Sequence, residues 1–458
     1  IFSAHRLNTS PVNTRAVVRD FNQPRGSIQT SDGVVIAESI PTPGDQFERL
    51  RQYPQGELFA HLTGYFSFTY GTEGVERTYN EVLTGRSKKV TLNNLGDLLL
   101  EKDSTANVTL TVSSQVQQVA TEELAGRKGA VVAIDPRDGA ILAAADYPSY
   151  DPNPLSAHDQ KTVRTAWDSL NADTDKPLLP RFYRERYFPG SSFKVVTAAT
   201  GLATGVATLT RPVYPELSEL DLPGSGQPLR NFGGETCGGP LPEILRISCN
   251  TAFAQLGLDI GGPKMSAGAD SFGFNKTPPI DLPSAAKSLF PDPSAFVRDK
   301  PGLAKSAIGQ QDVQATPMQM ALVASAIANG GVIMTPHVMK EVTDSKAEVI
   351  DTYSPKPWLT AVPAKVAADT KGMMVGVVED GTGTRAQIPG VTVAGKTGTA
   401  QTGLGTSHTW FIAFAPAEAP TVAVAVMLEN QSSADEATGG ALAAPIARTV
   451  MEAVLGGQ

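Results

Sequence analysis

The spacing of hydrophobic and polar positions divides the chain into two parts. Up to about residue 105 the sequence is mixed and polar, without strong periodicity. From residue 108 onward, short apolar runs alternate with longer segments of helical spacing, and this spacing is the primary signal for strands and helices. We therefore expect two domains, one over residues 1–105 and a larger one over residues 106–458.

The second part opens with a strand at residues 108–112, a helix at 115–124 and a hairpin. The hairpin consists of apolar runs at 130–134 and 140–145 on either side of an Asp-Pro-Arg-Asp-Gly turn. Because both runs are almost continuously apolar, the sheet that contains them should be covered on both faces.

Further helices and strands are predicted later in the chain. Helices are expected after Ser191 and at residues 241–256, 316–329 and 440–455, and strands at 392–395, 409–414 and 421–428. A strand pair, then helices, then three strands and a last helix describe an α+β fold in which an antiparallel sheet is sandwiched by helices.

The first part carries no catalytic combination of residues. An extended segment at 25–28, an Asp-Gly turn at 32–33 and a strand at 34–37 predict a hairpin. A short helix is expected at 79–83 and a terminal arm at 8–11. We expect this small mixed domain to bind or to position other groups.

Composition narrows the class of protein. The 458 residues are 41% hydrophobic and 18% charged, as in a globular chain of two or three domains. The net charge of −8 argues against a nucleic-acid-binding surface. The five histidines form no metal motif and two cysteines are too few for a zinc site, so we expect no metal and no cofactor.

Membrane insertion is not predicted for the chain as given. No apolar run reaches the roughly 18 residues that a spanning helix needs, so we expect a soluble chain. Its first residue is Ile1 rather than methionine, so we expect an upstream segment to have been removed.

The clearest chemical signal is the segment Pro189-Gly190-Ser191-Ser192-Phe193-Lys194, which precedes an apolar run. Pro-Gly is a turn signal, so a helix should begin at about Ser191, with Ser191 as its cap and Lys194 one turn later on the same side. A serine hydroxyl needs a base, and a lysine can be that base only when burial or a nearby cation keeps it neutral. The helix N-terminus would also favour a developing alkoxide.

Two further motifs distinguish Ser191 from chance. Ser248-Cys249-Asn250 follows it, and then Lys396-Thr397-Gly398-Thr399. Ser284 and Lys287 repeat the Ser-x-x-Lys spacing in an expected loop, and Ser169-Leu170-Asn171 precedes Ser191 and fails the order. The order Ser-x-x-Lys, Ser-x-Asn, Lys-Thr-Gly is that of penicillin-binding proteins and serine β-lactamases.

The Lys-Thr-Gly segment should bind substrate. We expect Lys396 to bind a substrate carboxylate and to help keep Lys194 neutral, with the hydroxyls of Thr397 and Thr399 facing the same carboxylate. Gly398 would let a substrate backbone lie close, although a strand glycine equally marks a bulge. The backbone N–H groups of Ser191 and Thr399 would form the oxyanion hole.

The Ser-x-Asn segment should move protons and hold the substrate. Ser248 can relay a proton between Lys194 and the leaving amine. Asn250 either holds a substrate amide carbonyl or caps the helix that follows it; both roles stay open. A disulfide between Cys237 and Cys249 would pin this segment, but the two residues could equally be small buried side chains that never meet, and spacing does not decide between these arrangements.

With these motifs the chain resembles the class B (monofunctional) high-molecular-mass penicillin-binding proteins. The resemblance covers nearly the whole chain and also rests on these segments: Arg25-Gly26, residues 71–76, Gly309-Gln310, residues 315–321, residues 329–331 and Trp410-Phe411. It implies a transpeptidase domain of the penicillin-binding and serine β-lactamase type behind a small non-catalytic pedestal domain.

The resemblance also implies D,D-transpeptidation. Ser191 would attack the penultimate D-Ala carbonyl of a peptidoglycan stem peptide, expel the terminal D-Ala and pass the acyl group to an amine on a neighbouring stem. β-Lactams would acylate the same serine. The family is anchored at the extracytoplasmic face of the plasma membrane by a helix that would precede Ile1, and the pedestal would contact membrane proteins of the division machinery during cell-wall synthesis, cell division and shaping of the cell.

Two alternatives stay open. Acylation alone would also serve a β-lactam-binding sensor or scaffold, and water as acceptor would make a D,D-carboxypeptidase. No Glu-x-x-Asn occurs between Asn250 and Lys396, and class A β-lactamases use such a glutamate in deacylation. A long-lived acyl-enzyme is therefore expected. Trp410 is expected in the core; the side chains of Arg181, Tyr183, Arg184 and Arg186 either line a substrate channel or form a solvated basic face.

Overall fold

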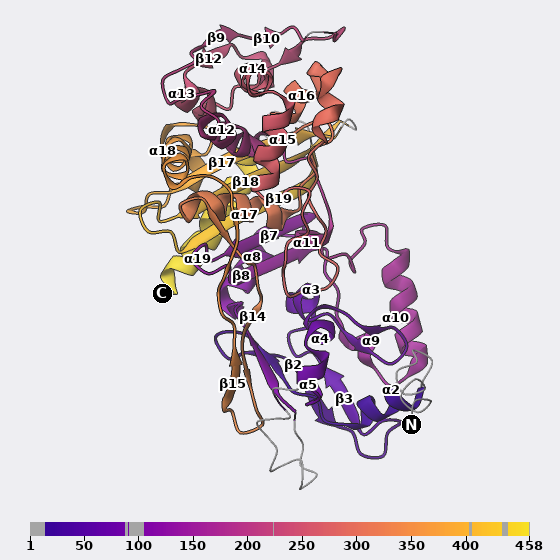
Figure 1. The fold of residues 1–458 in the computed structure, drawn as a ribbon. Coiled ribbons are helices and arrows are strands. Elements are labelled where there is room, and N and C mark those ends of the chain that lie inside the picture. Colours follow the sequence, from indigo (N-terminus) through magenta and orange to yellow (C-terminus); the bar gives the residue numbers. More distant parts are fainter. Residues whose placement is uncertain are drawn as a thin grey trace.

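The computed structural model describes residues 14–87, 90, 105–222, 224–402, 405–432 and 438–457. The predicted terminal arm at 8–11 lies outside these residues. The N-terminal elements form one end of an elongated molecule and the helices around α14 form the other, with a sheet between them (Figure 1).

A five-stranded antiparallel sheet is the centre of the larger part, with strand order β17-β18-β19-β7-β8. The strands are β7 (Gly129–Ile134), β8 (Ile141–Tyr147), β17 (Ala394–Gln401), β18 (Thr406–Ala415) and β19 (Val422–Ser432). The predicted hairpin and the three late strands are thereby confirmed.

Helices cover both faces of this sheet. The first face packs against α8 (Ser114–Leu124) and α19 (Ala444–Gly456), and the second against α17 (Pro317–Ala328) and α11 (Arg181–Arg184). Residues 422–428 of β19 are all buried, as expected for a strand covered on both sides. The expected antiparallel sheet between helices is confirmed.

A helical region lies beyond the β17 side of the sheet (Figure 1). It contains α12 (Lys194–Ala203), α13 (Leu241–Arg246), α14 (Asn250–Ile260), α15 (Gly262–Ser271), α16 (Lys300–Ser306) and α18 (Ala364–Asp380). Short strands complete it: β9 (Tyr214–Leu217), β10 (Glu219–Leu220), β11 (Leu229–Arg230), β12 (Cys237–Gly239), β13 (Val332–Met334) and β16 (Pro357–Thr360).

Two helix predictions need correction. The single helix predicted at 241–256 is broken into α13 and α14, because Ser248 has a φ of 61° and a left-handed residue cannot continue a right-handed helix. Ser191 is not a helix cap: it lies inside a 3₁₀ turn, η2 (Gly190–Phe193), which precedes α12, and no side-chain cap bond is made there.

The N-terminal part is built on a second sheet, ordered β15-β14-β6-β1-β2-β3. The predicted hairpin is confirmed, since β1 (Ile28–Gln29) pairs antiparallel with β2 (Val35–Pro41). β1 also pairs parallel with β6 (Asn107–Leu110), and the late hairpin β14 (Met339–Thr343) and β15 (Val349–Thr352) extends the sheet. Segments from both sides of residue 105 therefore share this sheet.

Short elements surround the N-terminal sheet. They are α2 (Thr14–Asn22), α3 (Ala60–Thr63), β4 (Phe66–Ser67), β5 (Gly71–Thr72), α4 (Gly74–Thr78), α5 (Asn80–Leu83), α9 (Asn153–Ser156) and α10 (Gln160–Ala172); the edge strand of the sheet itself is β3 (Arg49–Gln52). None of the helices in the described ranges has both the length and the apolar composition that crossing a bilayer requires.

A buried ionic cluster explains the N-terminal segments that carry the resemblance. The carboxylate of Glu76 has no exposed surface and binds two guanidinium groups, those of Arg25 at 2.6 Å and Arg51 at 2.5 Å. Beside Arg25, a Cβ on Gly26 would lie 1.9 Å from the carbonyl oxygen of Ala106, so only glycine allows β6 to approach. These residues hold the N-terminal part together.

Candidate active site

The turn that carries Ser191 is held by close backbone contacts. Gly190 has a φ of 53° and donates its N–H to the carbonyl of Gly309 at 2.9 Å. A Cβ on Gly309 would lie 2.1 Å from the carbonyl oxygen of Gly190, so this contact needs glycine. Ser191 is half-buried, and its hydroxyl makes no hydrogen bond with the described residues.

Strand β17 lies directly against this turn. A Cβ on Gly398 would lie 2.9 Å from the carbonyl oxygen of Pro189 and 3.0 Å from the nitrogen of Ser192. The Lys-Thr-Gly segment is in the middle of β17 and does not follow a strand that ends at 395, as predicted, because β17 continues to Gln401 in its ladder with β18. Trp410 of β18 is fully buried, as expected, and its indole N–H donates to Phe188 O at 2.9 Å.

Two buried lysines face each other across this site. Lys194 and Lys396 have no exposed surface. Burial, and then the charge of Lys396, hold the pKa of Lys194 well below its usual value, while burial lowers the pKa of Lys396 to about 7. Both effects favour the neutral amine of Lys194, which is the state that a base requires.

The hydroxyl of Ser248 joins the two lysines. Lys194 Nζ lies 2.6 Å from Ser248 O, 2.7 Å from Asn250 Oδ1 and 3.3 Å from Ser248 Oγ. All three oxygens therefore lie within hydrogen-bond distance of Lys194 Nζ. Lys396 Nζ donates to the same Oγ at 2.9 Å. A proton can therefore pass between Lys396, Ser248 and Lys194.

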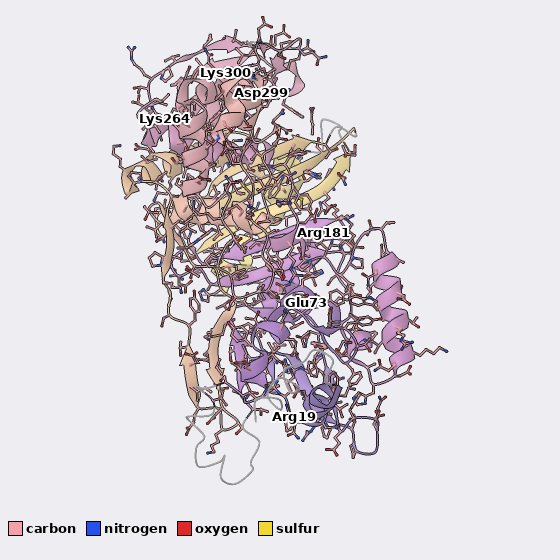
Figure 2. The ribbon with its side chains drawn as sticks, turned by 45° about the vertical axis from the view of Figure 1, so that its right-hand side comes forward. Arg19, Glu73, Arg181, Lys264, Asp299 and Lys300 are labelled. Atoms are coloured by element: carbon pink, nitrogen blue, oxygen red, sulfur yellow. A yellow bond between two sulfur atoms is a disulfide. The ribbon has the colours of Figure 1, made fainter. Side chains whose placement is uncertain are left out.

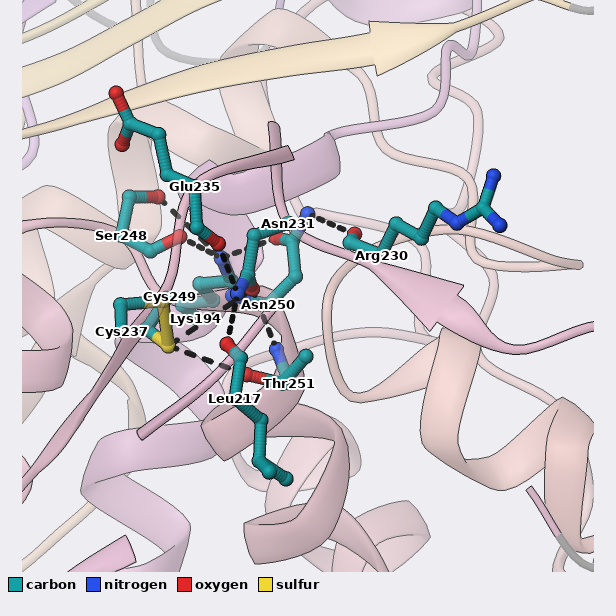
Figure 3. Close-up of a disulfide and its surroundings, with 10 residues drawn as sticks. All are labelled: Lys194, Leu217, Arg230, Asn231, Glu235, Cys237, Ser248, Cys249, Asn250 and Thr251. Atoms are coloured by element: carbon teal, nitrogen blue, oxygen red, sulfur yellow. Dashed lines mark hydrogen bonds between the residues drawn. A yellow bond between two sulfur atoms is a disulfide. The ribbon is translucent and has the colours of Figure 1, made fainter. Parts of the chain in front are cut away.

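The Ser-x-Asn segment is fixed from one side (Figure 3). Cys237 and Cys249 form a disulfide. The alternative, in which they are two separate buried side chains, is therefore wrong. Asn231 Oδ1 accepts the backbone N–H groups of Asn250 at 3.0 Å and Thr251 at 2.9 Å. Asn250 does not cap α14 itself; its Oδ1 accepts from Lys194 and its Nδ2 donates to the carbonyl of Arg230 at 3.1 Å.

Two residues that contribute to the site were missed in the sequence. One is Asn231, which caps α14 from a distant loop. The other is Thr382, in the loop after α18, whose Oγ1 lies 2.6 Å from Thr397 Oγ1. The Gly-Thr-Gly-Thr sequence at residues 381–384 is the only local signal for Thr382, and it indicates a loop, not a role.

The site therefore gathers residues from four segments of the chain. They are η2 and the start of α12 (Ser191, Lys194), the α13–α14 turn (Ser248, Cys249, Asn250), β17 (Lys396, Thr397, Gly398, Thr399) and β12, whose Cys237 is bonded to Cys249. Ser169 lies on α10 and Ser284 in a loop, and neither joins the site.

The prediction of a solvated basic face before Ser191 is wrong for its first two members. Tyr183 is fully buried and Arg181 is 1% exposed. Arg181 Nε lies 3.0 Å from Glu429 Oε1, and Arg184 Nη2 lies 2.7 Å from Glu73 Oε1 in the N-terminal part. The guanidinium groups of Arg181 and Arg184 therefore make ion pairs within the molecule.

Two family models match the chain. Residues 129–452 match the penicillin binding protein transpeptidase domain, and residues 25–108 match the penicillin binding protein A dimerisation domain. The peptidoglycan D,D-transpeptidase PbpA of Mycolicibacterium smegmatis is 40% identical over 470 residues, which span 99% of this chain and 94% of that protein. The peptidoglycan D,D-transpeptidase PbpA of Mycobacterium tuberculosis is 39% identical, and the match spans 100% of this chain and 94% of that protein.

Solved structures show the same similarity. Penicillin-binding protein A from M. tuberculosis, as a ceftriaxone acyl-enzyme complex, has a TM-score of 0.89 and 38% identity and covers 96% of this chain and 100% of that one. PBP2 of Pseudomonas aeruginosa has a TM-score of 0.78 and 30% identity, covering 95% and 96%.

Proposed function

The chain belongs to the class B penicillin-binding proteins, and from that premise we propose that Ser191 is the nucleophile and Lys194 the base of its peptidoglycan D,D-transpeptidase activity. The observation that supports these roles is the contact of two buried lysines with one serine hydroxyl, 3.3 Å and 2.9 Å from Ser248 Oγ. Burial and the charge of Lys396 lower the pKa of Lys194, and this favours the neutral amine that a base requires.

Acylation begins when Lys194 removes the proton of Ser191. The alkoxide attacks the penultimate D-Ala carbonyl, and the oxyanion forms beside the backbone N–H groups of Ser191 and Thr399. Lys396, with Thr397, holds the substrate carboxylate; this negative charge favours the ammonium form of Lys396. The proton taken by Lys194 passes through Ser248 to the departing D-Ala amine.

Transfer to the acceptor reverses these steps. The amine of a second stem peptide loses a proton to the same lysine, attacks the ester carbonyl and releases Ser191 with the cross-link formed. A β-lactam enters by the same first step, but its leaving nitrogen stays tethered in the opened ring. The adduct then blocks the acceptor, as the β-lactam acyl-enzyme complexes of M. tuberculosis penicillin-binding protein A illustrate for that protein.

For the rest of the chain we propose residues 1–105 as a non-catalytic pedestal and residues 106–458 as the transpeptidase domain. The pedestal would contact membrane proteins of the division machinery, and a preceding helix would anchor the enzyme at the extracytoplasmic face of the plasma membrane. What supports this is the position of every proposed catalytic residue beyond residue 105, together with the family.

Intact-protein mass spectrometry tests the proposal. Wild type and Ser191→Ala are incubated with penicillin G, and the mass is followed over time. We expect one adduct per chain that persists for hours in the wild type and is absent from the folded Ala variant. An adduct that vanishes within minutes would instead favour a β-lactamase, and no adduct on folded wild type would contradict the site.

A further inference from the structure

We propose that a cavity between the N-terminal and transpeptidase parts binds one pyranose ring of a cell-wall glycan strand. The cavity has a volume of about 220 Å³ and takes its lining from both parts, with Tyr65 and Glu73 on one side and Trp167, Tyr183 and Arg184 on the other. Figure 2 shows Glu73 at the level where the two parts meet. The inference rests on the proposed function, because the stem peptides to be joined are carried by such strands.

Aromatic rings form the walls of the cavity. The indole of Trp167 is held in place by Tyr70, which stacks on it at 4.0 Å, and Tyr65 meets it edge-on at 6.3 Å. Tyr150 and Tyr183, also in the lining, are buried. The face of an aromatic ring is partly negative and attracts the C–H groups on the flat side of a sugar ring. Tyr70 covers one face of the Trp167 indole, and the guanidinium of Arg184 lies over the Tyr183 ring at 5.0 Å, so a pyranose would pack against the ring surfaces that these two contacts leave open.

Polar groups lie in the lining beside the rings. Arg184 Nη2 donates to Glu73 Oε1 at 2.7 Å, and both side chains remain partly exposed. The hydroxyl of Tyr183 is buried and has no hydrogen-bond partner among the described residues. A buried polar group without a partner is unfavourable, and a hydroxyl or acetamido group of a bound sugar would supply one.

The charge of the lining favours a neutral ligand. Glu73 and Arg184 neutralise each other, and His61 is buried with its pKa lowered to about 4, so this imidazole is neutral. The described lining therefore offers no unpaired cation for a phosphate or carboxylate and no unpaired carboxylate for an amine. A neutral ring with several hydroxyl groups matches this surface better than a charged ligand.

Backbone contacts fix the position of Glu73. Gly64 and Gly74 have φ values of 71° and 59°, and a Cβ on Gly64 would lie 2.1 Å from the carbonyl oxygen of Glu73. Both glycines line the cavity, so part of its wall is bare backbone. The volume of about 220 Å³ lies below the roughly 300–1,000 Å³ of pockets for drug-sized ligands, so the cavity suits one small ring.

Tryptophan fluorescence tests this proposal on the full chain. Of the three tryptophans, Trp410 is fully buried and Trp167 lines the cavity. We expect N,N′-diacetylchitobiose to cause a saturable change that Trp167→Phe abolishes. Tyr183→Phe should weaken the affinity about five- to tenfold, whereas Tyr147→Phe, at an exposed tyrosine outside the cavity, should leave it unchanged.

A folding defect is separated from a binding defect by thermal unfolding. Tyr183→Phe should melt close to the wild type, because its buried hydroxyl makes no well-formed hydrogen bond that the change would remove. A column of immobilised, peptide-free glycan strands should retain the wild-type protein. Free N,N′-diacetylchitobiose should then elute the protein from this column. No saturable change in the wild type, an undiminished affinity of Tyr183→Phe, or no release by the disaccharide would overturn the proposal. Acylation by penicillin is measured on the same sample, so a failure of the proposed function is seen independently.

Discussion

At the scale of single residues, the proposed chemistry depends on the charges of two buried lysines. Lys194 must be neutral to accept a proton, while Lys396 must be charged to hold a carboxylate. Burial lowers both pKa values, and Lys396 adds its own charge to the effect on Lys194. A pKa of about 7 for Lys396 means that the free enzyme loses this cation as the pH rises through neutrality.

Acylation by penicillin should therefore decline above about pH 7. The pH dependence of the second-order rate constant for acylation reports the pKa values of groups in the free enzyme. Stopped-flow measurements from about pH 5 to about pH 9 should therefore show this rate constant falling on the basic side. Lys396→Arg should react more slowly because its geometry differs, but the decline should disappear, since a guanidinium stays protonated throughout this range. If the rate still declines above about pH 7 in Lys396→Arg, the ionisation that causes the decline belongs to another group.

Thr382 should act through Thr397. Its Oγ1 lies 2.6 Å from Thr397 Oγ1, which also accepts from Lys396 Nζ at 3.2 Å. Thr382→Val should slow acylation by a carboxylate-bearing β-lactam about five- to tenfold, because one hydrogen bond close to a charged group is lost. Thr382→Ser keeps the hydroxyl and should restore the wild-type rate. The exposed Thr384, two residues later, provides the control: Thr384→Val should match the wild type, and equal effects at both positions would refute the role.

At the scale of elements, the sheet and its helices could be predicted because their signals are local. The continuous apolar runs of β7 and β19, and the longer apolar run of α17, can each be recognised alone from their length and composition. The break at Ser248 could not be predicted, because it depends on contacts with Lys194, Asn231 and Cys237 from distant segments. The same holds for Thr382, which is brought to β17 only by the packing of α18.

The disulfide should stabilise the turn between α13 and α14. It closes a loop over a separation of 12 residues, for which removal of the cross-link costs about 2–3 kcal/mol. The double variant Cys237→Ser, Cys249→Ser should melt at a lower temperature and acylate more slowly, because Ser248 and Asn250 lose this constraint. Reductant should lower the wild-type midpoint and leave the variant unaffected. A wild-type midpoint that stays constant after both thiols are shown to be free would contradict this role.

At the scale of the whole molecule, the two parts are joined by more than a linker. β6 and the β14–β15 hairpin extend the N-terminal sheet. Asp281 accepts the hydroxyl of Tyr79 at 2.5 Å and the backbone N–H groups of Val338 and Met339 at 2.7 and 2.9 Å. Because these contacts connect the junction between α4 and α5 with segments beyond Lys194, loss of the N-terminal core should affect the catalytic part.

Glu76→Gln tests this connection. The change leaves two buried guanidinium groups without their carboxylate, and breaking a buried ionic cluster costs about 3–5 kcal/mol. Since the parts share a sheet, we expect circular dichroism and the loss of penicillin acylation to shift together to a lower temperature. Glu81→Gln, at an exposed position on α5, should leave both transition temperatures, of circular dichroism and of penicillin acylation, unchanged. If the variant instead unfolds in two steps and remains fully acylated after the first, the N-terminal part is an independent unit, and its contacts with the transpeptidase part contribute little to holding the active site in place.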